Sequence, residues 1–217
     1  RELEEVHVTE NLKRTVAALK AELADLDETV HDLADRERSC ALVQRRHGAF
    51  DTSGIANSTF AIHRLNFIVY LDLNGRVCFG DAFDLATDSR LGLPPSLRAA
   101  VEVRSPLTSH AAVADAVMGV LRAGKRYMLV ASCPILAGGK KESICGTLIT
   151  GREITTQLIG RLGGTAQLSL DLFDANDSSL PPPRPHTAPG FSPDVSRIAI
   201  KPLGHGRIAG YAWFDDV

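Results

Sequence analysis

The chain has 217 residues, of which 44% are hydrophobic, and a formal net charge of −2 at pH 7. This length is sufficient for one domain of ordinary size with a full hydrophobic core. The near-neutral charge and the lack of a basic stripe interleaved with aromatic residues argue against a nucleic-acid-binding protein. No apolar stretch approaches the ~20 residues that span a bilayer, and the N-terminus lacks the pattern of a signal peptide.

The two ends of the sequence bear on its origin. It begins Arg1-Glu2-Leu3 without a methionine, and it stops at Asp215-Asp216-Val217, directly after an aromatic-rich strand pattern. We therefore expect a fragment of a longer protein, with membrane helices just outside both ends.

An apolar heptad seam marks the first part of the chain, with steps that alternate between four and three residues. Its members are Leu12, Val16, Leu19, Leu23, Leu26, Val30 and Leu33. The spacing predicts a long helix that begins near Thr9 or Asn11 and extends to about His47. Two interpretations are open: the seam contributes to the core of one globular unit, or it is also a dimer interface that passes a signal along the helix.

Two β-hairpins are predicted in the middle of the chain. In the first, a β run over residues 67–72 leads into the turn Asn74-Gly75, and residues 76–79 return. Asn-Gly is a strong hairpin signal, because both central residues of that turn type take positive φ. In the second hairpin, residues 126–136 and 143–150 form the two strands on either side of a polar, glycine-containing turn.

Helices are predicted between and after the hairpins. The spacing of apolar residues indicates helices over residues 97–103 and 110–121, and Gly124 follows the second of them. Another amphipathic helix follows Arg152 and ends at Gly163-Gly164.

The last part of the chain reads as β structure with one long excursion. Residues 167–172 alternate between apolar and polar side chains, as a half-exposed strand does. Residues 178–193 form a Pro/Ser-rich segment typical of a flexible excursion. Two final strands are predicted over residues 197–200 and 207–214.

The order of these elements predicts the α+β class. We expect a long N-terminal helix followed by an antiparallel sheet with helices, which resembles the PAS and Cache sensor folds, and then C-terminal strands. On this pattern the chain divides into a signalling helix (residues 1–47), a sensor core (48–165) and C-terminal strands (166–217).

Several short motifs, taken in order along the chain, resemble the CHASE4 family of extracellular sensory domains. The residues that carry the family motifs are Asp32, Ala34, Asn57, Asp72, Gly75 and Gly151. They are joined by Pro134-Ile135 in a later strand and by Arg152 after the last glycine. One departure is that residues 35–38 read Asp-Arg-Glu-Arg where the family carries a Trp-Asp pair, which implies an altered pocket or a different ligand.

The resemblance implies a non-enzymatic, ligand-sensing domain on the periplasmic or extracellular side of a bacterial inner-membrane protein. That protein would control a diguanylate cyclase or phosphodiesterase of cyclic di-GMP signalling, or a histidine kinase. A small-molecule ligand and flanking membrane helices are implied, and no cofactor is expected. The heptad seam indicates a homodimer, and the charge pattern indicates no nucleic-acid partner. The alternative is a cytoplasmic PAS-like dimerisation module without a small ligand.

A sensor of this fold binds its ligand between the sheet and the connecting segments, where apolar walls surround a few polar side chains. The strand residues that meet this description are Tyr70, Tyr127, Ser132, Thr147 and Arg152. Each has a structural alternative, because tyrosine and threonine are ordinary strand residues and Arg152 can cap carbonyl groups or pair with an acid.

The four cysteines, Cys40, Cys78, Cys133 and Cys145, lack metal-ligand or redox spacing. With a turn centred near Gly139, Cys133 and Cys145 lie opposite each other and can form a cross-strand disulfide, which an oxidising compartment favours. One residue of register slip excludes this bridge and leaves buried thiols. No nucleophile elbow, HExxH motif, phosphate loop or dinucleotide fingerprint is present in the sequence, so no catalytic or metal residue is predicted.

Overall fold

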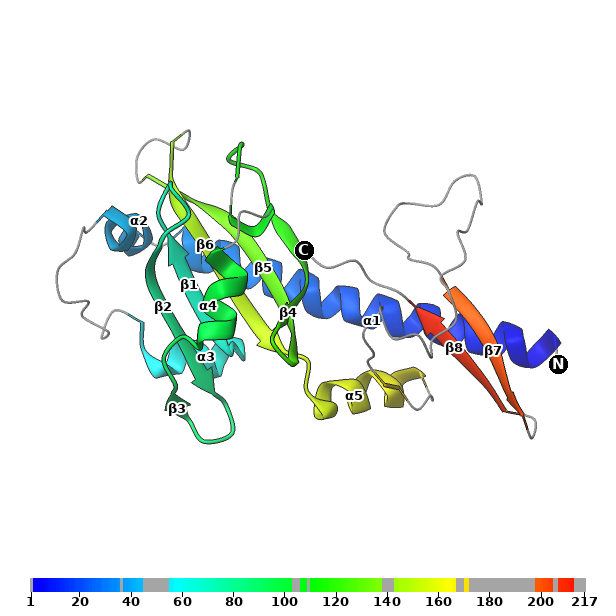
Figure 1. Cartoon of the computed structure of the whole chain (residues 1–217). Helices are drawn as coiled ribbons and strands as arrows, with labels where there is room; N and C mark the ends of the chain where they lie inside the picture. Colours follow the sequence, from blue (N-terminus) through cyan, green and yellow to red (C-terminus); the bar gives the residue numbers. More distant parts are fainter. Residues whose placement is uncertain are drawn as a thin grey trace. The chain divides into compact units, whose positions relative to one another are not determined.

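The computed structural model of the chain describes residues 2–35, 37–44, 55–102, 106–108, 110–137, 143–166, 170–171, 198–204 and 207–212. Figure 1 labels the helices and strands that these residues form. The chain divides into two compact units, Arg1–Glu22 with Thr155–Asp215, and Leu23–Ile154 with Asp216–Val217. Helix α1 (Glu2–Ala34) contributes to both units, so the units do not coincide with the division predicted at residue 47.

Helix α1 ends earlier than the sequence predicts. Its last residue is Ala34, and a separate helix, α2 (Glu37–Gln44), follows it. The hydroxyl of Ser39 donates a hydrogen bond of 2.7 Å to the carbonyl oxygen of Leu33. This carbonyl is one of those that have no hydrogen-bond partner within the helix at its C-terminal end. The prediction of one continuous helix is therefore wrong beyond Ala34, and residues 45–47 lie outside the described residues.

Most of the heptad seam is buried inside the chain. Six of its seven members are 0–8% exposed, and Leu23 is partly exposed. The buried members are Leu12, Val16, Leu19, Leu26, Val30 and Leu33. The structure therefore shows the interpretation in which the seam supplies the core, and dimer formation stays a prediction.

A six-stranded antiparallel sheet forms the centre of the unit Leu23–Ile154. Its strands are β1 (Phe67–Leu71), β2 (Val77–Asp84), β3 (Ser89–Arg90), β4 (Val117–Ala123), β5 (Arg126–Leu136) and β6 (Ile144–Glu153). The strand order is β3-β2-β1-β6-β5-β4, so the two predicted hairpins meet where β1 pairs with β6. This unit also contains the C-terminal part of α1, helix α2, α3 (Asn57–His63), α4 (Pro95–Glu102) and the 3₁₀ helix η2 (Pro106–Thr108). The predicted α+β, PAS/Cache-like class is confirmed.

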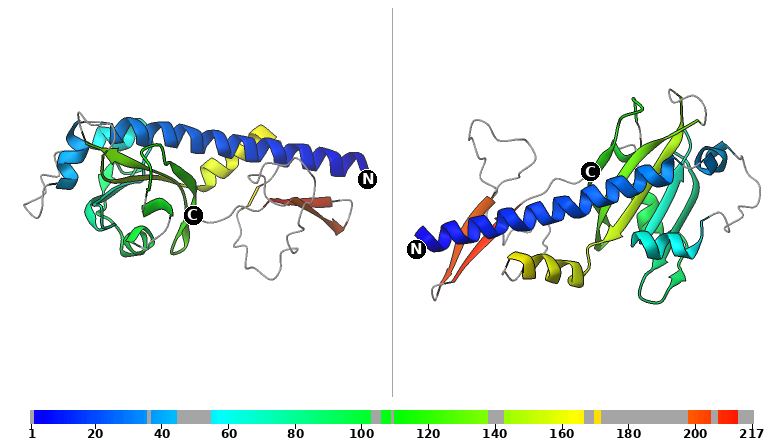
Figure 2. Two further views of the ribbon diagram at one scale, coloured as in Figure 1. Left: turned by 90° about the horizontal axis from the view of Figure 1, so that it is seen from above. Right: turned by 180° about the vertical axis from the view of Figure 1, so that it is seen from behind.

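The sheet has two differently covered faces. On one, which we call the α4 face, Phe67, Val69 and Leu71 of β1 join side chains of α4 and η2 in a buried apolar cluster. Because successive strand residues point to opposite sides, their neighbours lie on the other side, the α1 face. There the thiol of Cys133 lies 3.6 Å from the carbonyl oxygen of Val30 in α1. Figure 2 shows this part of α1 and helix α4 on opposite sides of the sheet.

The first hairpin is confirmed, but its turn differs from the expected type. Among its residues only Gly75 takes a positive φ, of 74°, whereas Asn74 does not. The carboxylate of Asp72 accepts hydrogen bonds from the backbone N–H groups of Asn74 at 2.8 Å and Arg76 at 2.9 Å. These side-chain hydrogen bonds fix the turn, so the left-handed conformation is needed at the glycine alone.

The helix predicted over residues 110–121 is wrong. Val117–Ala123 form β4, an edge strand that pairs with β5 across a two-residue turn. Gly124, the first residue of this turn, has a φ of 68°. The apolar spacing of this segment fits either structure, and the glycine-containing turn together with the β-branched Val117 and Val120 favours the hairpin.

The remaining elements agree with the predicted types. The second hairpin forms from β5 and β6, and the amphipathic helix is α5 (Thr156–Ala166), which continues through the two glycines expected to end it. The two final strands are β7 (Ile198–Gly204) and β8 (Arg207–Ala212), which pair antiparallel. The alternating segment 167–172 and the Pro/Ser-rich segment 178–193 lie almost wholly outside the described residues.

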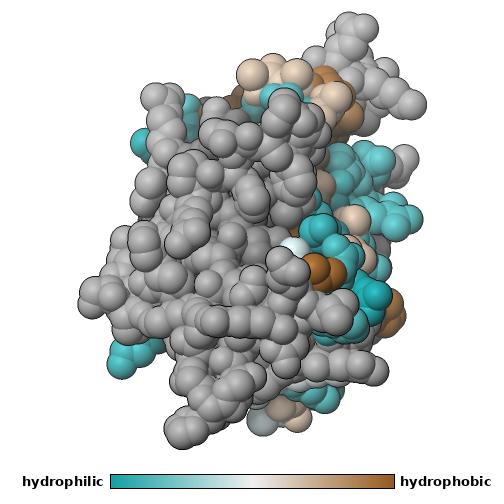
Figure 3. Space-filling view, turned by 90° about the vertical axis from the view of Figure 1, so that its right-hand side faces the viewer, coloured by the Kyte–Doolittle hydropathy of each residue, from teal (hydrophilic) through white to brown (hydrophobic). Residues whose placement is uncertain are grey.

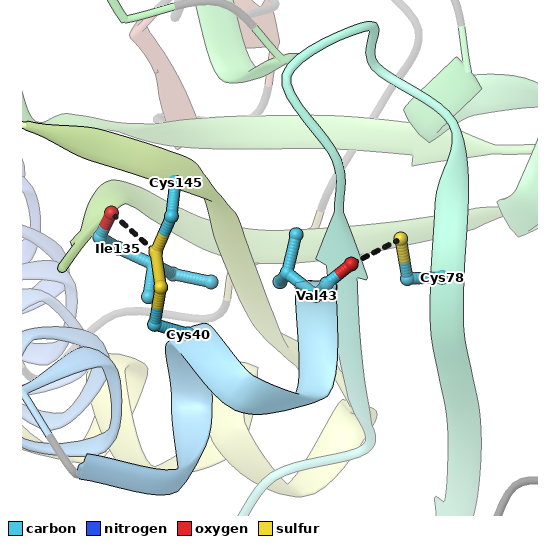
Figure 4. Close-up of a disulfide and its surroundings, with 5 residues drawn as sticks. All are labelled: Cys40, Val43, Cys78, Ile135 and Cys145. Atoms are coloured by element: carbon cyan, nitrogen blue, oxygen red, sulfur yellow. Dashed lines mark hydrogen bonds between the residues drawn. A yellow bond between two sulfur atoms is a disulfide. The ribbon is translucent and has the colours of Figure 1, made fainter. Parts of the chain in front are cut away.

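A disulfide joins Cys40 of α2 to Cys145 of β6, as Figure 4 shows. The Cα atoms of the two residues are 5.9 Å apart. The predicted bridge between Cys133 and Cys145 is wrong, because Cys133 is a buried free thiol that pairs with Leu148 in the sheet register. The turn assumed near Gly139 does not match the observed register. Sequence spacing alone therefore gave the wrong partner for Cys145.

Candidate functional site

The structure divides the five predicted ligand side chains between the two faces of the sheet. Ser132 pairs with Ile149, a member of the apolar cluster, and Thr147 lies two residues from Ile149 on the same α4 face. The three others alternate with cluster-face residues along their strands and so lie on the α1 face. These three are Tyr70, Tyr127 and Arg152. The five residues therefore do not line a single site.

A buried polar group on the α4 face involves His110, Ser132 and the backbone of Leu107. The Ser132 side chain is 0% exposed, and its hydroxyl donates to the carbonyl oxygen of Leu107 at 2.6 Å. Nε2 of His110 lies 2.8 Å from the same hydroxyl oxygen. Because the hydroxyl has a single proton and the carbonyl only accepts, Nε2 carries the proton and donates to Ser132.

The other ring nitrogen of His110 has no such partner. Nδ1 is buried and makes no hydrogen bond within the part of the chain that the structure describes. Burial lowers the pKa of His110 and the charge of His31 lowers it further, whereas the carboxylate of Asp115 raises it. Since buried polar atoms are rarely left without a partner, His110 is the candidate binding residue of this face.

The segment after His110 is held by local hydrogen bonds. Oδ2 of Asp115 accepts from the backbone N–H groups of Ala111 at 2.8 Å and Ala112 at 2.7 Å. The carboxylate therefore fixes the backbone next to the imidazole and also places a negative charge in its surroundings.

On the α1 face, Arg152 connects β6 with α1 and α3. Its side chain is 8% exposed, and its Nη1 lies 2.6 Å from Oδ2 of Asp25. Its Nε and Nη2 donate to the backbone carbonyl of His63 at 3.2 Å and 3.0 Å. The structure thus shows the alternative in which Arg152 pairs with an acid and caps a carbonyl group.

A second arginine reaches the same carboxylate. Nη2 of Arg64 lies 3.4 Å from Oδ2 of Asp25, and Arg64 itself caps α3 with a φ of 54°. The hydrogen bond from Arg152 lowers the pKa of Asp25, the charges of both arginines add to this effect, and desolvation opposes it. Asp25 is therefore held in its charged form at neutral pH.

The two predicted tyrosines contact neighbouring side chains of the sheet. Tyr70 packs edge-on against Phe79, with ring centroids 6.1 Å apart. The guanidinium carbon of Arg122 lies 6.0 Å from the ring centroid of Tyr127. Ligand contacts by these tyrosines and by Thr147 stay a prediction.

The Asn57 motif takes part in a structural clamp around Arg90. The guanidinium donates to Oδ1 of Asn57 at 2.7 Å, to Oδ2 of Asp81 at 2.9 Å and to the carbonyl oxygen of Ile55. It also lies 5.7 Å from the ring centroid of Phe60. Asn57 therefore helps to hold the start of α3 against β2 and β3.

The family-motif residues outside these clusters occupy packing and surface positions. A Cβ atom at Gly151 would collide with the ring of Phe67, so the close approach of the two strands requires glycine. Ala34 is 3% exposed and Asp32 is exposed on α1. Asp72 and Gly75 form the first hairpin turn.

We find no second candidate binding site on the surface of the described residues. No group of three His, Cys, Asp or Glu side chains within the described ranges could hold a metal ion. None of the helices that the structure describes is long and apolar enough for a membrane span. On the face in Figure 3, the coloured apolar atoms lie in small groups among hydrophilic ones. The exposed large apolar residues are Val6, Ile62, Leu73, Leu85, Leu91 and Met118.

The sequence pattern does not single out His110 or Asp25. His110 lies in a segment whose spacing indicates a helix, and Asp25 is one of several acids on the flank of α1. The one signal for the His110 group is Ser132, a polar side chain in an otherwise apolar run.

Comparisons with known proteins agree with the motif resemblance. The CHASE4 domain family matches residues 18–173. The methanogenesis regulatory histidine kinase FilI of Methanothrix harundinacea (strain 6Ac) is 26% identical over 168 residues. This alignment covers 77% of the chain and 18% of FilI, so the chain spans less than a fifth of that relative.

This chain is also similar to solved structures. The periplasmic domain of Vibrio cholerae LuxQ aligns with a TM-score of 0.52 and 10% identity, over 74% of this chain and 71% of that one. The E. coli DcuS sensor domain aligns with a TM-score of 0.43 and 16% identity, over 68% of this chain and 96% of that one. The LuxQ alignment supports the α+β fold described above, and the family match over most of the chain's length shows that the chain belongs to the CHASE4 domain family.

Proposed function

We propose that this chain is the extracytoplasmic ligand-sensing domain of a transmembrane signal-transduction protein. Membership of the CHASE4 family is the observation that carries the proposal. The similarity of fold to the periplasmic domain of LuxQ and the relationship in sequence to a histidine kinase, FilI, support it. The proposed output is a histidine kinase, or a diguanylate cyclase or phosphodiesterase, in a part of the protein beyond this chain.

The proposed ligand is a small molecule that binds on the α4 face. Strand β6 lies between that face and α1, because Gly151 faces the cluster side while Arg152 contacts Asp25. Ligand binding would shift the population of conformations at this junction, and α1 would carry the change onward.

The disulfide supports a periplasmic location. Disulfides persist in oxidising compartments and are rare in the cytosol, so the Cys40–Cys145 bridge disfavours the rival interpretation of a cytoplasmic PAS-like module. Mapping the disulfide peptides in protein purified from its native compartment tests the location. A fully reduced Cys40 in that protein would favour the cytoplasmic alternative.

We also propose that the receptor is a homodimer anchored by membrane helices outside this chain. Since the seam residues are buried, the dimer contact is expected at exposed positions of α1 such as Glu28. In membranes containing the full-length protein, Glu28→Cys should crosslink and the buried Leu26→Cys should not. Crosslinking at neither position would contradict a dimer through this helix.

Thermal unfolding in the presence of candidate metabolites tests the sensing function. A ligand that binds only the folded state at about one hundred times its Kd adds about 2.7 kcal/mol to the free energy of unfolding. The same compound should change the output of the full-length protein. Stabilisation of the chain without any change in output would contradict a sensory role.

A further inference from the structure

We propose that Nδ1 of His110 recognises a ligand that donates an N–H or O–H hydrogen bond, such as an alcohol, an amide or an ammonium group. The inference rests on the proposed sensing function. It adds the recognition residue and the chemical class of the ligand.

The direction of the hydrogen bonds around Ser132 fixes the tautomer of His110. The serine proton lies toward the carbonyl oxygen of Leu107 at 2.6 Å, so the hydroxyl oxygen is left to accept. Nε2 of His110 is 2.8 Å from that oxygen and is the group that donates to it. The neutral imidazole therefore carries its proton on Nε2, which leaves a bare lone pair on Nδ1.

The lone pair on Nδ1 is buried and no described residue donates to it. Burial favours the neutral ring by lowering the pKa of His110, and the nearby His31 acts in the same direction. An acceptor in such surroundings is destabilised until it receives a hydrogen bond. A carboxylate or phosphate dianion has no hydrogen to give and so does not fit this position.

The neighbouring groups define the rest of the ligand. Ser132 lies opposite Val117 of β4 and Ile149 of β6, and both of these side chains belong to or pack on the apolar cluster. The negative charge of Asp115 raises the pKa of His110. The same charge would attract a cationic donor. The position therefore fits a donor group attached to a small apolar skeleton.

The ring nitrogens of His110 can be observed directly in the whole chain labelled with ¹⁵N-histidine. We expect the Nε2–H tautomer at neutral pH. The probes are 1-propanol, propionamide and n-propylamine, with propionate as a control of the same skeleton. The three donors should shift the Nδ1 resonance of His110, and propionate should not.

Two variants test the assignment further. His110→Phe keeps a ring but removes the acceptor, and we expect the affinity for the donor probes to fall by about tenfold or more. Ser132→Ala removes the oxygen that accepts from Nε2, so the proton of His110 is no longer held on that nitrogen. The preference of the site for the donor probes over propionate should therefore fall. His7→Phe, which changes an exposed histidine of α1, should leave the affinity unchanged. The tautomer and the response to the probes are measured in the unaltered chain, so they test the proposal even where a variant fails to fold.

Each outcome bears on the proposal. A proton on Nδ1 in the unaltered chain overturns it, and so does an equal response to propionate. An Nδ1 resonance that no donor shifts, in a chain that nonetheless binds a metabolite, leaves the sensing function standing and overturns the assignment of Nδ1 as the recognition atom. If the donor probes shift the Nδ1 resonance but the output of the full-length protein never responds to any ligand, the results would support this site and contradict the sensing function.

Discussion

Arg152 on β6 and Asp25 on α1 are 127 residues apart in sequence, yet Nη1 of one lies 2.6 Å from Oδ2 of the other. The arginine side chain is 8% exposed and the aspartate side chain is 54% exposed. The pair is therefore a partly buried charge contact in which the arginine is the desolvated partner.

Removal of either partner should destabilise the chain. Asp25→Asn leaves a buried guanidinium without its counter-charge, and we expect the free energy of unfolding to fall by about 2 kcal/mol. Arg152→Met also removes the hydrogen bonds to His63 and should cost about 3 kcal/mol. Urea unfolding followed by circular dichroism measures both changes.

A neighbouring ion pair provides the control for these variants. Arg126 lies 3.2 Å from Glu153, but its side chain is 66% exposed. Arg126→Met should therefore change the free energy of unfolding by less than about 0.5 kcal/mol. Equal losses for Arg126→Met and Arg152→Met would contradict the structural importance of the Arg152–Asp25 pair.

The Gly151 position should not tolerate a methyl group. A Cβ atom there would collide with the Phe67 ring, so Gly151→Ala should cost about 3 kcal/mol of stability. Nothing lies within 4 Å of a Cβ atom at Gly160 in α5, and Gly160→Ala should stabilise the chain by about 0.5 kcal/mol. Adding Phe67→Leu to Gly151→Ala should recover part of the loss, and strictly additive effects would argue against the proposed collision.

Loss of the disulfide should have a large effect. Cys40 and Cys145 close a loop with a sequence separation of 105, and Cys40→Ser should lower the free energy of unfolding by about 4 kcal/mol. Cys78→Ser, which changes a partly exposed free thiol, is the control and should have little effect. Peptide mapping should recover a Cys40–Cys145 link, and a Cys133–Cys145 link would show that the sheet register is wrong.

The two free thiols should differ in reactivity under native conditions. Cys133 is 0% exposed, and burial, with smaller effects of Asp27 and Asp35, raises its pKa to about 12. Burial also raises the pKa of Cys78, but this residue is partly exposed. Iodoacetamide should therefore modify Cys78 first, as mass spectrometry of timed samples can show. Similar modification rates at the two sites would indicate that Cys133 is not buried.

Stability should depend on pH through His110. The pKa of His110 is lowered in the folded chain, whereas an unfolded histidine titrates near pH 6.5. As the pH falls below about 6.5, the unfolded chain takes up a proton that folded His110 does not, so stability decreases until the pH passes the folded pKa. The loss between about pH 8 and about pH 5 should be smaller in His110→Phe than in the unaltered chain. His7→Phe should follow the unaltered chain, and coincident profiles for all three proteins would contradict this role.

Local sequence signals are sufficient for much of the fold. Asn74-Gly75 marks the first hairpin because the chain reversal depends on residues within the turn itself. The segment around Val117 and Val120 shows the limit of such signals, since its apolar spacing fits a helix and a strand equally well. Pairing with β5 decides between them, and that pairing is not visible in the segment alone.

The candidate site depends on contacts between distant parts of the chain. Ser132 is recognisable in sequence as a polar residue in an apolar run, but its partner His110 comes from another segment. The partner of Cys145 likewise comes from α2 and not from its own hairpin. Such pairings follow from the sheet register and from helix packing, so residue spacing alone does not predict them.

Gly151 and Arg152 are consecutive residues that serve opposite sides of one strand. A single peptide unit therefore separates the aromatic ring on one side from the charged contact on the other. Any tilt of that unit therefore moves Gly151 against the Phe67 ring and, at the same time, moves the base of the Arg152 side chain that reaches Asp25. The C-terminal end of β6 thus links the two faces of the sheet through adjacent backbone atoms.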